Sequence, residues 1–305
     1  MATTQPTVRP MPGPQPDVAV KRSSMAANHF WSQVAVYTLA ILTALAFSLP
    51  FFWTVTSSLK TAAEIRQVPP TFIPQDVRWA NYSDVFRIAP FAKFIWNTAV
   101  ITSLAMIGQI ISAAAVAFGF TRFRFPGRDW LFFVVLSTMM LPWQVTIVPQ
   151  FLLFRYLGWI NTFMPLIIPS FFGGGAFFIF LLRQFFMTIP RDLDEAAKLD
   201  GASSVRIFWN IILPLSGPAL ATVAIFSFLQ HWNEFIGPLL FLNTQDKFTL
   251  SIGLRYFMVN PFENDEPREA ILMAASLIVA LPSLVLFFVA QKYFVRGIVT
   301  TGLKG

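Results

Sequence analysis

Residues 192–214, "DLDEAAKLDGASSVRIFWNIILP", form a charged stretch between two segments that are almost wholly apolar. The carboxylates of Asp192, Asp194 and Glu195 lie close together at its start, and Lys198 follows one turn later. Negative charge is favoured at the N-terminal end of a helix dipole and positive charge at the C-terminal end. The first eight residues of the stretch therefore predict a short helix.

A glycine divides the stretch in two. Gly201 is a typical residue directly after a helix C-terminus. Ser203 or Ser204 can cap a second helix, which we expect Pro214 to end. The insert 190–214 is thus predicted to be two short helices around a glycine turn, lying beside the membrane rather than crossing it.

One face of the first predicted helix is apolar and small. Leu193, Ala196 and Ala197 are spaced at i, i+3 and i+4 and share this face. Small alanines allow another surface to approach the backbone closely. The pattern fits either a docking surface for a protein partner or an amphipathic helix that rests on lipid headgroups.

The composition is that of a membrane protein. The 305 residues are 55% hydrophobic but only 12% charged, about half the charge of an ordinary soluble domain. With no cysteine, a disulfide framework, a cysteine-ligated metal and a thiol nucleophile are excluded. The two histidines, His29 and His231, are too few for a histidine-based metal cluster. The net charge of +7 does not indicate nucleic-acid binding, because basic residues gather on the cytoplasmic side of membrane proteins.

Six stretches are long and apolar enough to span a bilayer, which needs about 20 such residues. They are 33–56, 94–120, 130–153, 162–187, 216–242 and 271–295. We therefore expect an all-α polytopic protein with a six-span domain over 29–305. The proline-rich residues 1–28 are predicted to be a disordered arm.

The distribution of charge predicts that both termini are cytoplasmic. In that orientation thirteen of the 22 Lys and Arg residues lie inside, three of them in the short loop 121–129, and six of the 15 acidic residues do. The arm 1–28, the insert and a tail, 296–305, are then cytoplasmic. Segments 57–93 and 243–270 are then outside.

Residue identities in the insert add a resemblance to a known family. Glu195-Ala196-Ala197, Gly201, Ile211 and Leu213-Pro214 reproduce the E-A-A-x3-G-x9-I-x-L-P signature of ABC importer permeases. In addition, "LQHWNEFIGPLLFL" resembles the fifth span of sugar permeases, and "GIVTTGLKG" resembles the tail of maltose-type permeases. Over roughly residues 30–305 the chain resembles carbohydrate ABC transporter permeases of the maltose-permease type, which have the type I importer permease fold.

This resemblance implies a role for the insert. In the family it is the coupling helix that docks into a cytoplasmic ATPase, so that ATP-driven closure rocks the spans between two access states. Glu195 would bond to the ATPase, the alanines would allow close seating, and Gly201 would set the angle between the helices. The implied ATPase-coupling residues are Leu193, Glu195, Ala196, Ala197, Asp200 and Gly201. The implied ATPase-contacting tail residues are Gly302, Leu303, Lys304 and Gly305.

The resemblance also implies partners in a prokaryotic inner membrane. These are a second permease subunit in a heterodimer, two copies of an ATP-binding subunit, and a solute-binding protein that meets segment 243–270. The chain contains no G-x-x-x-x-G-K-[ST] phosphate loop, and the glycines at 173–175 lack the following lysine. We therefore expect a transport subunit without enzymatic activity that binds no cofactor, while its partner ATPase uses ATP and magnesium.

The candidates for a solute pathway are Gln109, Trp143, Gln144, Gly174, Asn233 and Glu234. Gln109, Trp143, Gln144 and Gly174 reach the depth of the bilayer midplane, whereas Glu234 is in the outer half of the fifth span. Polar groups at this depth are costly unless they face protein or a water-filled cavity. The alternative is that they join helices, through amide hydrogen bonds and close glycine packing. Prolines 142, 149, 165 and 169 predict that the third and fourth spans are kinked or broken.

The function that the sequence favours is ATP-driven uptake of a sugar or oligosaccharide. The same machine could carry glycerol phosphate or another polar solute. A proton-coupled transporter that uses His231 and Glu234 is a rival, although these residues fit better as a local pair near the outer gate. No paired carboxylates, metal cluster or nucleophile motif supports a membrane enzyme.

Overall fold

The computed structural model describes residues 22–258 and 268–302, with side chains for 30–258 and 268–291. Throughout these ranges the regular structure is helical, without a β-strand. The chain divides into two compact units, residues 1–53 and 54–305. The predicted arm 1–28 lies largely outside the described residues.

The first unit is described from Arg22, where the helix α1 (Arg22–Ser57) begins. Its Phe30–Ser57 segment is long and apolar enough to cross a membrane. The helix thus begins inside the range assigned to the arm. It covers the predicted span 33–56 completely.

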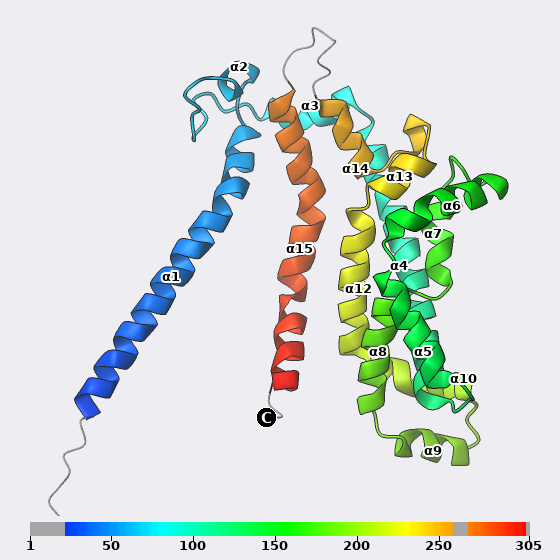
Figure 1. Ribbon diagram of the computed structural model, residues 1–305. Helices are drawn as coiled ribbons and strands as arrows, with labels where there is room; N and C mark the ends of the chain where they lie inside the picture. Colours follow the sequence, from blue (N-terminus) through cyan, green and yellow to red (C-terminus); the bar gives the residue numbers. More distant parts are fainter. Residues whose placement is uncertain (1–21, 259–267, 303–305) are drawn as a thin grey trace, which may run out of the picture. The chain divides into compact units, whose positions relative to one another are not determined.

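The second unit contains all other helices (Figure 1). In chain order they are α2 (Ala62–Ile65), α3 (Ala80–Ile88), α4 (Phe91–Arg122), α5 (Arg128–Ser137), η1 (Thr138–Met140), α6 (Trp143–Tyr156), α7 (Met164–Ile167), η2 (Ile168–Phe171), α8 (Ala176–Thr188), α9 (Asp192–Leu199), α10 (Ser204–Ile207), η3 (Phe208–Ile212), α11 (Leu213–Leu215), α12 (Gly217–Trp232), α13 (Ile236–Phe241), η4 (Gln245–Lys247), α14 (Leu250–Gly253), η5 (Leu254–Phe257) and α15 (Glu269–Gly302).

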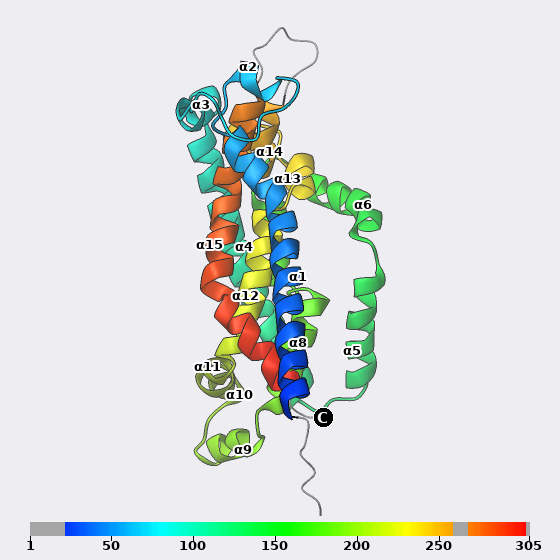
Figure 2. The same cartoon turned by 90° about the vertical axis from the view of Figure 1, so that its left-hand side faces the viewer.

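Three segments of this unit meet the length and hydropathy of single membrane spans: Phe91–Arg122, Met164–Thr188 and Glu269–Gln291. The third predicted span instead consists of Arg128–Met140 and Trp143–Tyr156, which meet at 96°. Pro142 stands at the start of α6 and donates no backbone hydrogen bond, so the break falls where the prolines predict it. Figure 2 shows α6 turning away from the line of α5.

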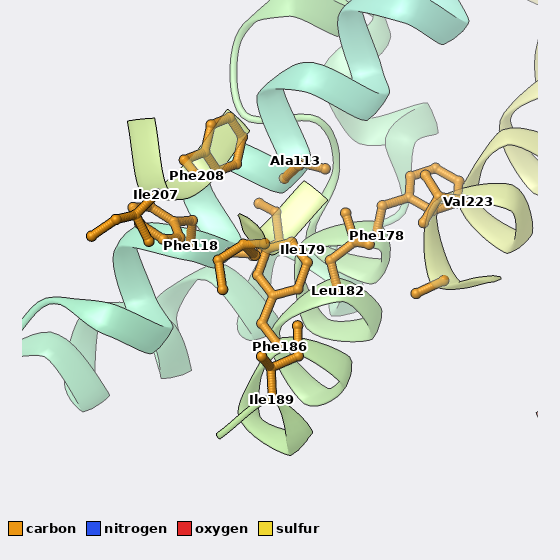
Figure 3. Packing of buried hydrophobic residues seen from close by; sticks show 14 of the residues in the cluster. Ala113, Phe118, Phe178, Ile179, Leu182, Phe186, Ile189, Ile207, Phe208 and Val223 are labelled. Carbon is orange, nitrogen blue, oxygen red and sulfur yellow. The ribbon is translucent and has the colours of Figure 1, made fainter. Parts of the chain in front are cut away.

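The helices α4, α8 and α12 run side by side and form the main core of the unit (Figures 1 and 2). On α4, Ala113, Ala114 and Ala117 are fully buried, and their small side chains let the other helices approach closely. On α8, Phe178, Leu182 and Phe186 recur every fourth residue on one face and fill the space against them. Figure 3 shows this packing.

The second half of the predicted insert belongs to the same core. Ile207, Phe208 and Ile212, from α10 and η3, are buried against α4 and α8. Figure 3 shows Phe208 and Ile207 beside Phe118 of α4. The insert is therefore fixed to the spanning helices through its own apolar side chains.

A second core lies at the opposite end of the unit, where α3, α4, α14 and α15 meet. Phe91 and Phe94 pack edge-on, and Phe91 also meets Phe257. Trp232, at the end of α12, donates a hydrogen bond from its indole nitrogen to the carbonyl of Val279, at 3.0 Å. This bond and the small buried residues of α15 hold α12 and α15 together.

Candidate functional site

The insert forms the two helices that its sequence predicts. α9 ends at Leu199, and Gly201 follows with a φ of 78°, in the left-handed region that favours glycine. The N–H of Ala202 donates to the carbonyl of Ala197 at 2.8 Å, and the N–H of Gly201 donates to that of Lys198 at 3.0 Å. These two bonds make a Schellman motif, which explains why the helix stops here.

The second helix begins at the predicted cap but does not end at the predicted residue. The Ser203 hydroxyl accepts a hydrogen bond from the N–H of Arg206 at 3.3 Å. Pro214, by contrast, lies inside α11, which ends at Leu215. The π-type turn before it, in which the N–H of Leu213 bonds to the carbonyl of Phe208, widens the backbone and accommodates the proline ring. The segment Ser204–Leu215 then meets α12 at 81°.

A buried ion pair anchors α9 to the end of α4. Asp194 lies 2.9 Å from the guanidinium of Arg122, and the two side chains are only 9% and 6% exposed. Arg122 also donates to the carbonyl of Ile189, and Arg191 donates to the carbonyl of Thr121. The sequence pattern assigned Asp194 only to the helix dipole and did not single out Arg122. The signal that could have found the pair is the arginine-rich loop that directly follows α4.

The remaining charges of α9 point outward. Among the residues predicted to couple to an ATPase, Leu193, Glu195, Ala196, Asp200 and Gly201 are exposed. Leu199 adds an apolar side chain that is 89% exposed. Ala197 is half-buried and packs against the hydrophobic core of the second unit, so this residue helps to hold α9 in place. Figure 1 shows α9 at the extreme end of the second unit.

The predicted tail site is described only in part. Gly302 is the last residue of α15. Leu303, Lys304 and Gly305 lie outside the described residues.

A cavity of about 490 Å³ lies between α4, α6, α7, α12 and α13. Two predicted pathway residues, Trp143 and Glu234, line it. Gln144 is exposed and does not belong to the lining, and neither does Asn233, whose amide bonds to the carbonyl of Leu229. Sequence reasoning missed further polar lining residues, which come from separate segments: Thr98, Gln150, Ser170, Gln230 and Thr249.

Gln109 is buried behind the wall of this cavity. Its side-chain oxygen accepts hydrogen bonds from the hydroxyl of Ser227, at 2.5 Å, and from Nε2 of His231, at 3.1 Å. Ser227 and His231 belong to α12, whereas Gln109 belongs to α4. Gln109 therefore joins two spanning helices and reaches the cavity only through His231, which lines it.

His231 and Glu234 line the same cavity, but each forms its hydrogen bond with a different partner. His231 bonds to Gln109, and Oε1 of Glu234 accepts the N–H of Gly237 at 2.9 Å. In the described part of the chain no ion pair joins the two side chains. The helix α12 ends at Trp232 and α13 begins at Ile236. Glu234 therefore lies in the turn between them, and not on the helical face that carries His231.

Gly174 serves helix packing rather than a pathway. Its φ is 60°, and a Cβ atom added to it would lie 2.4 Å from the backbone nitrogen of Ala113. The break before α8 therefore presses directly against the backbone of α4. This is the close glycine packing that the sequence left as the alternative.

Comparison with known proteins identifies the class. Residues 109–300 match the family described as "Binding-protein-dependent transport system inner membrane component". This match covers more than half of the chain, so the chain belongs to that family. It is a permease subunit of an ATP-binding-cassette importer, with the type I permease fold, and it is a component of the inner membrane.

Individual relatives cover almost the whole chain. The chain is 30% identical to the probable ABC transporter permease protein YurM of Bacillus subtilis over 297 residues, 96% of each protein. It is 30% identical to the sn-glycerol-3-phosphate transport system permease protein UgpE of Yersinia enterocolitica, over 90% of this chain and 99% of the relative. Among solved structures, a bacterial ABC transporter involved in the import of the acidic polysaccharide alginate matches with a TM-score of 0.77, at 26% identity over 88% of this chain and 98% of that chain.

Proposed function

We propose that this chain is one of two permease subunits in an importer that takes up a sugar or oligosaccharide by alternating access. The observation that carries this proposal is the arrangement of α9. Its exposed face presents Leu193, Glu195, Ala196 and Leu199, while Asp194 anchors it to α4. A short helix that is both exposed and rigidly anchored can pass a displacement from a docked partner to the spanning helices.

The contacts provide a mechanical route. A push on α9 acts on the end of α4 through the pair between Asp194 and Arg122. α4 in turn packs on α8 and α12, and Gln109 bonds to α12 at the cavity wall. ATP binding in the partner would favour one access state through different contacts at α9 in the two states.

The partners follow from this mechanism. Two copies of a cytoplasmic ATPase would dock on α9 and on the equivalent helix of a second, different permease subunit, with both termini cytoplasmic. The ATPase would use ATP and magnesium, since this chain has no phosphate loop. A solute-binding protein would meet the opposite end, near α13 and α14.

Two other cargo or energy schemes are less well supported. Relatives named for sn-glycerol 3-phosphate make a phosphorylated polyol the second candidate cargo. Coupling to a proton gradient has less support, because His231 and Glu234 each bond to a different structural partner.

Purification of the chain with its native partners in mild detergent tests the proposal. We expect a second permease subunit and an ATPase to co-purify, identified by mass spectrometry. A chain that purifies alone and transports solute on a proton gradient would refute the proposal.

A charge reversal on α9 tests the docking face. We expect Glu195→Lys to lower ATP-dependent uptake in proteoliposomes by roughly tenfold or more, because like charges across an interface cost several kcal/mol. Gly201→Asp should also lower ATP-dependent uptake. Gln67→Lys, an exposed position in the turn after α2, is the control and should leave uptake unchanged. Full uptake by Glu195→Lys in correctly inserted protein would rule out a docking role for this residue.

A further inference from the structure

The lining of the cavity between α4, α6, α7, α12 and α13 contains one acidic residue among those described. Of its described lining residues, Glu234 carries the only formal charge, and neither Lys nor Arg is among them. Lys93, near the same end of α4, pairs with Asp246 at 2.6 Å. That hydrogen bond lowers the pKa of Asp246 and compensates the charge of Lys93. Among the described lining residues, Glu234 therefore contributes a negative charge that no Lys or Arg offsets.

The neutral polar groups of the lining suit hydroxyl groups. Gln150 and Gln230 provide amides that both donate and accept hydrogen bonds. The hydroxyl of Thr249 is buried and without a hydrogen-bond partner in the described structure. A buried polar group without a partner is costly unless a water or ligand satisfies it. Thr249 belongs to the cavity wall, but its hydroxyl oxygen is enclosed by protein, so the polar character of the open cavity comes from the other lining side chains.

Three further side chains of the lining fit a sugar ring and its hydroxyl groups. Trp143 is 39% exposed, so part of its ring is accessible at the cavity, where the apolar face of a pyranose can stack. Glu234 uses Oε1 for the N–H of Gly237, and a carboxylate retains further acceptor sites. His231 gives Nε2 to Gln109, which leaves Nδ1 of a neutral ring as an acceptor. The volume of about 490 Å³ lies within the range of small-molecule sites.

We infer that this chain itself contains a solute-contact site, formed by Trp143, Gln150, Gln230, Glu234 and Thr249, which accepts neutral polyhydroxylated solutes and disfavours phosphorylated or acidic ones. The inference rests on the proposed import function and narrows its cargo. Glu234 repels an anion that enters the cavity, and no lining cation offsets this repulsion. Solutes such as sn-glycerol 3-phosphate and alginate, for which relatives are named, would therefore be disfavoured in this cavity.

Glu234 is inferred to act as a charge filter, which means that it disfavours anions in the cavity. Because the chain has no cysteine, an introduced thiol can test this directly. Gln150→Cys places the only thiol of this chain on the cavity wall. Gln144→Cys is the matched control, since it lies on the same helix but outside the lining. In the intact complex, without ATP, the rates of modification by cationic 2-aminoethyl and anionic 2-sulfonatoethyl methanethiosulfonate are measured for both variants.

We expect the ratio of cationic to anionic rate to be about fivefold higher at position 150 than at position 144. Adding Glu234→Gln, which keeps an acceptor for the N–H of Gly237, should bring the two ratios together. A change in the pKa of the introduced thiol affects both reagents equally and cancels in the ratio. Equal ratios at the two positions, or a ratio that Glu234→Gln leaves unchanged, would overturn the inference.

Solute protection completes the test. A panel of maltose, sucrose and cellobiose is expected to slow modification of Gln150→Cys, while sn-glycerol 3-phosphate is not. Equal protection by the phosphate, or protection by none of the neutral sugars, would overturn the site. The result is separable from the proposed function: a complex without an ATPase would refute ATP-driven import, yet the measured rate ratio would still decide the charge filter.

Discussion

The two-helix insert, residues 190–214, and the cavity are built in opposite ways. The insert is continuous in sequence, and its cap, glycine stop and dipole charges are all local. The cavity takes its walls from five helices and from the segment before α14, and its lining residues range from Thr98 to Thr249 in the sequence. The comparison teaches that an exposed two-helix insert can be encoded in one short segment, whereas a cavity between helices depends on packing throughout the unit.

The largest expected effect concerns the buried ion pair that joins the insert to α4. Asp194→Ala leaves the buried guanidinium of Arg122 without its partner, which costs about 3–5 kcal/mol of stability. Thermal unfolding in detergent measures this loss as a lower Tm. The double variant Asp194→Leu with Arg122→Met should recover most of it, because apolar residues of similar volume replace the pair. An unchanged Tm for Asp194→Ala alone would show that this ion pair is not needed to hold α9.

The next effect concerns the packing that positions the cavity wall. Gly174→Ala places a Cβ 2.4 Å from the backbone of Ala113 in a left-handed conformation, so overpacking and strain should together cost about 2–4 kcal/mol. Gly158→Ala is the matched control. It has a φ of 71° but open space around the added Cβ, and should cost only about 1 kcal/mol. Equal losses of Tm in the two variants would mean that strain alone, and not contact with α4, matters at Gly174.

A smaller effect is expected at the link between α4 and α12. Ser227→Ala removes one of the two hydrogen bonds to the side-chain oxygen of Gln109, and the bond from His231 remains. The loss should be about 1 kcal/mol. Ser227→Thr, which keeps the hydroxyl, is the control for the hydrogen bond. If Ser227→Ala is as stable as the unmodified chain, this polar link is not needed to hold the cavity wall.

The smallest effect concerns the cap of the second insert helix. Ser203→Ala removes an exposed hydrogen bond of 3.3 Å and should cost ~0.5 kcal/mol. Ser203→Asp should restore the cap. A loss as large as that of Asp194→Ala would show that the insert depends on its local signals as strongly as on its tertiary anchor.

Some features could be predicted from the sequence because they depend on neighbouring residues. Each of these features depends on residues only a few positions apart. They are the apolar stretches, the proline breaks, the glycine stop after α9 and the cap at Ser203. The predicted helix end at Pro214 was also based on neighbouring residues alone, and it was wrong by one residue. A proline usually ends a helix, but the π-type turn before it depends on how Phe208 and Ile212 pack against the core.

The candidate site was only partly predictable. Trp143 and Glu234 were selected by depth and polarity, and both line the cavity. Gln144 and Asn233 met the same criteria, yet they face elsewhere, because depth does not specify direction around a helix axis. The burial of Thr249, the packing of Gly174 on α4 and the hydrogen bond between His231 and Gln109 depend on contacts between distant segments.

The sequence by itself determined the class of this protein: an apolar, multi-span permease with a charged two-helix insert. These properties come from hydropathy, helix dipoles and turn residues, all of which act over short distances along the chain. Only the tertiary structure decided which charge of the insert is buried and which polar residues surround the cavity. It also decided which glycine packs against the backbone of α4. Burial and pairing are properties of packed surfaces, and in this chain those surfaces join residues that the sequence holds far apart.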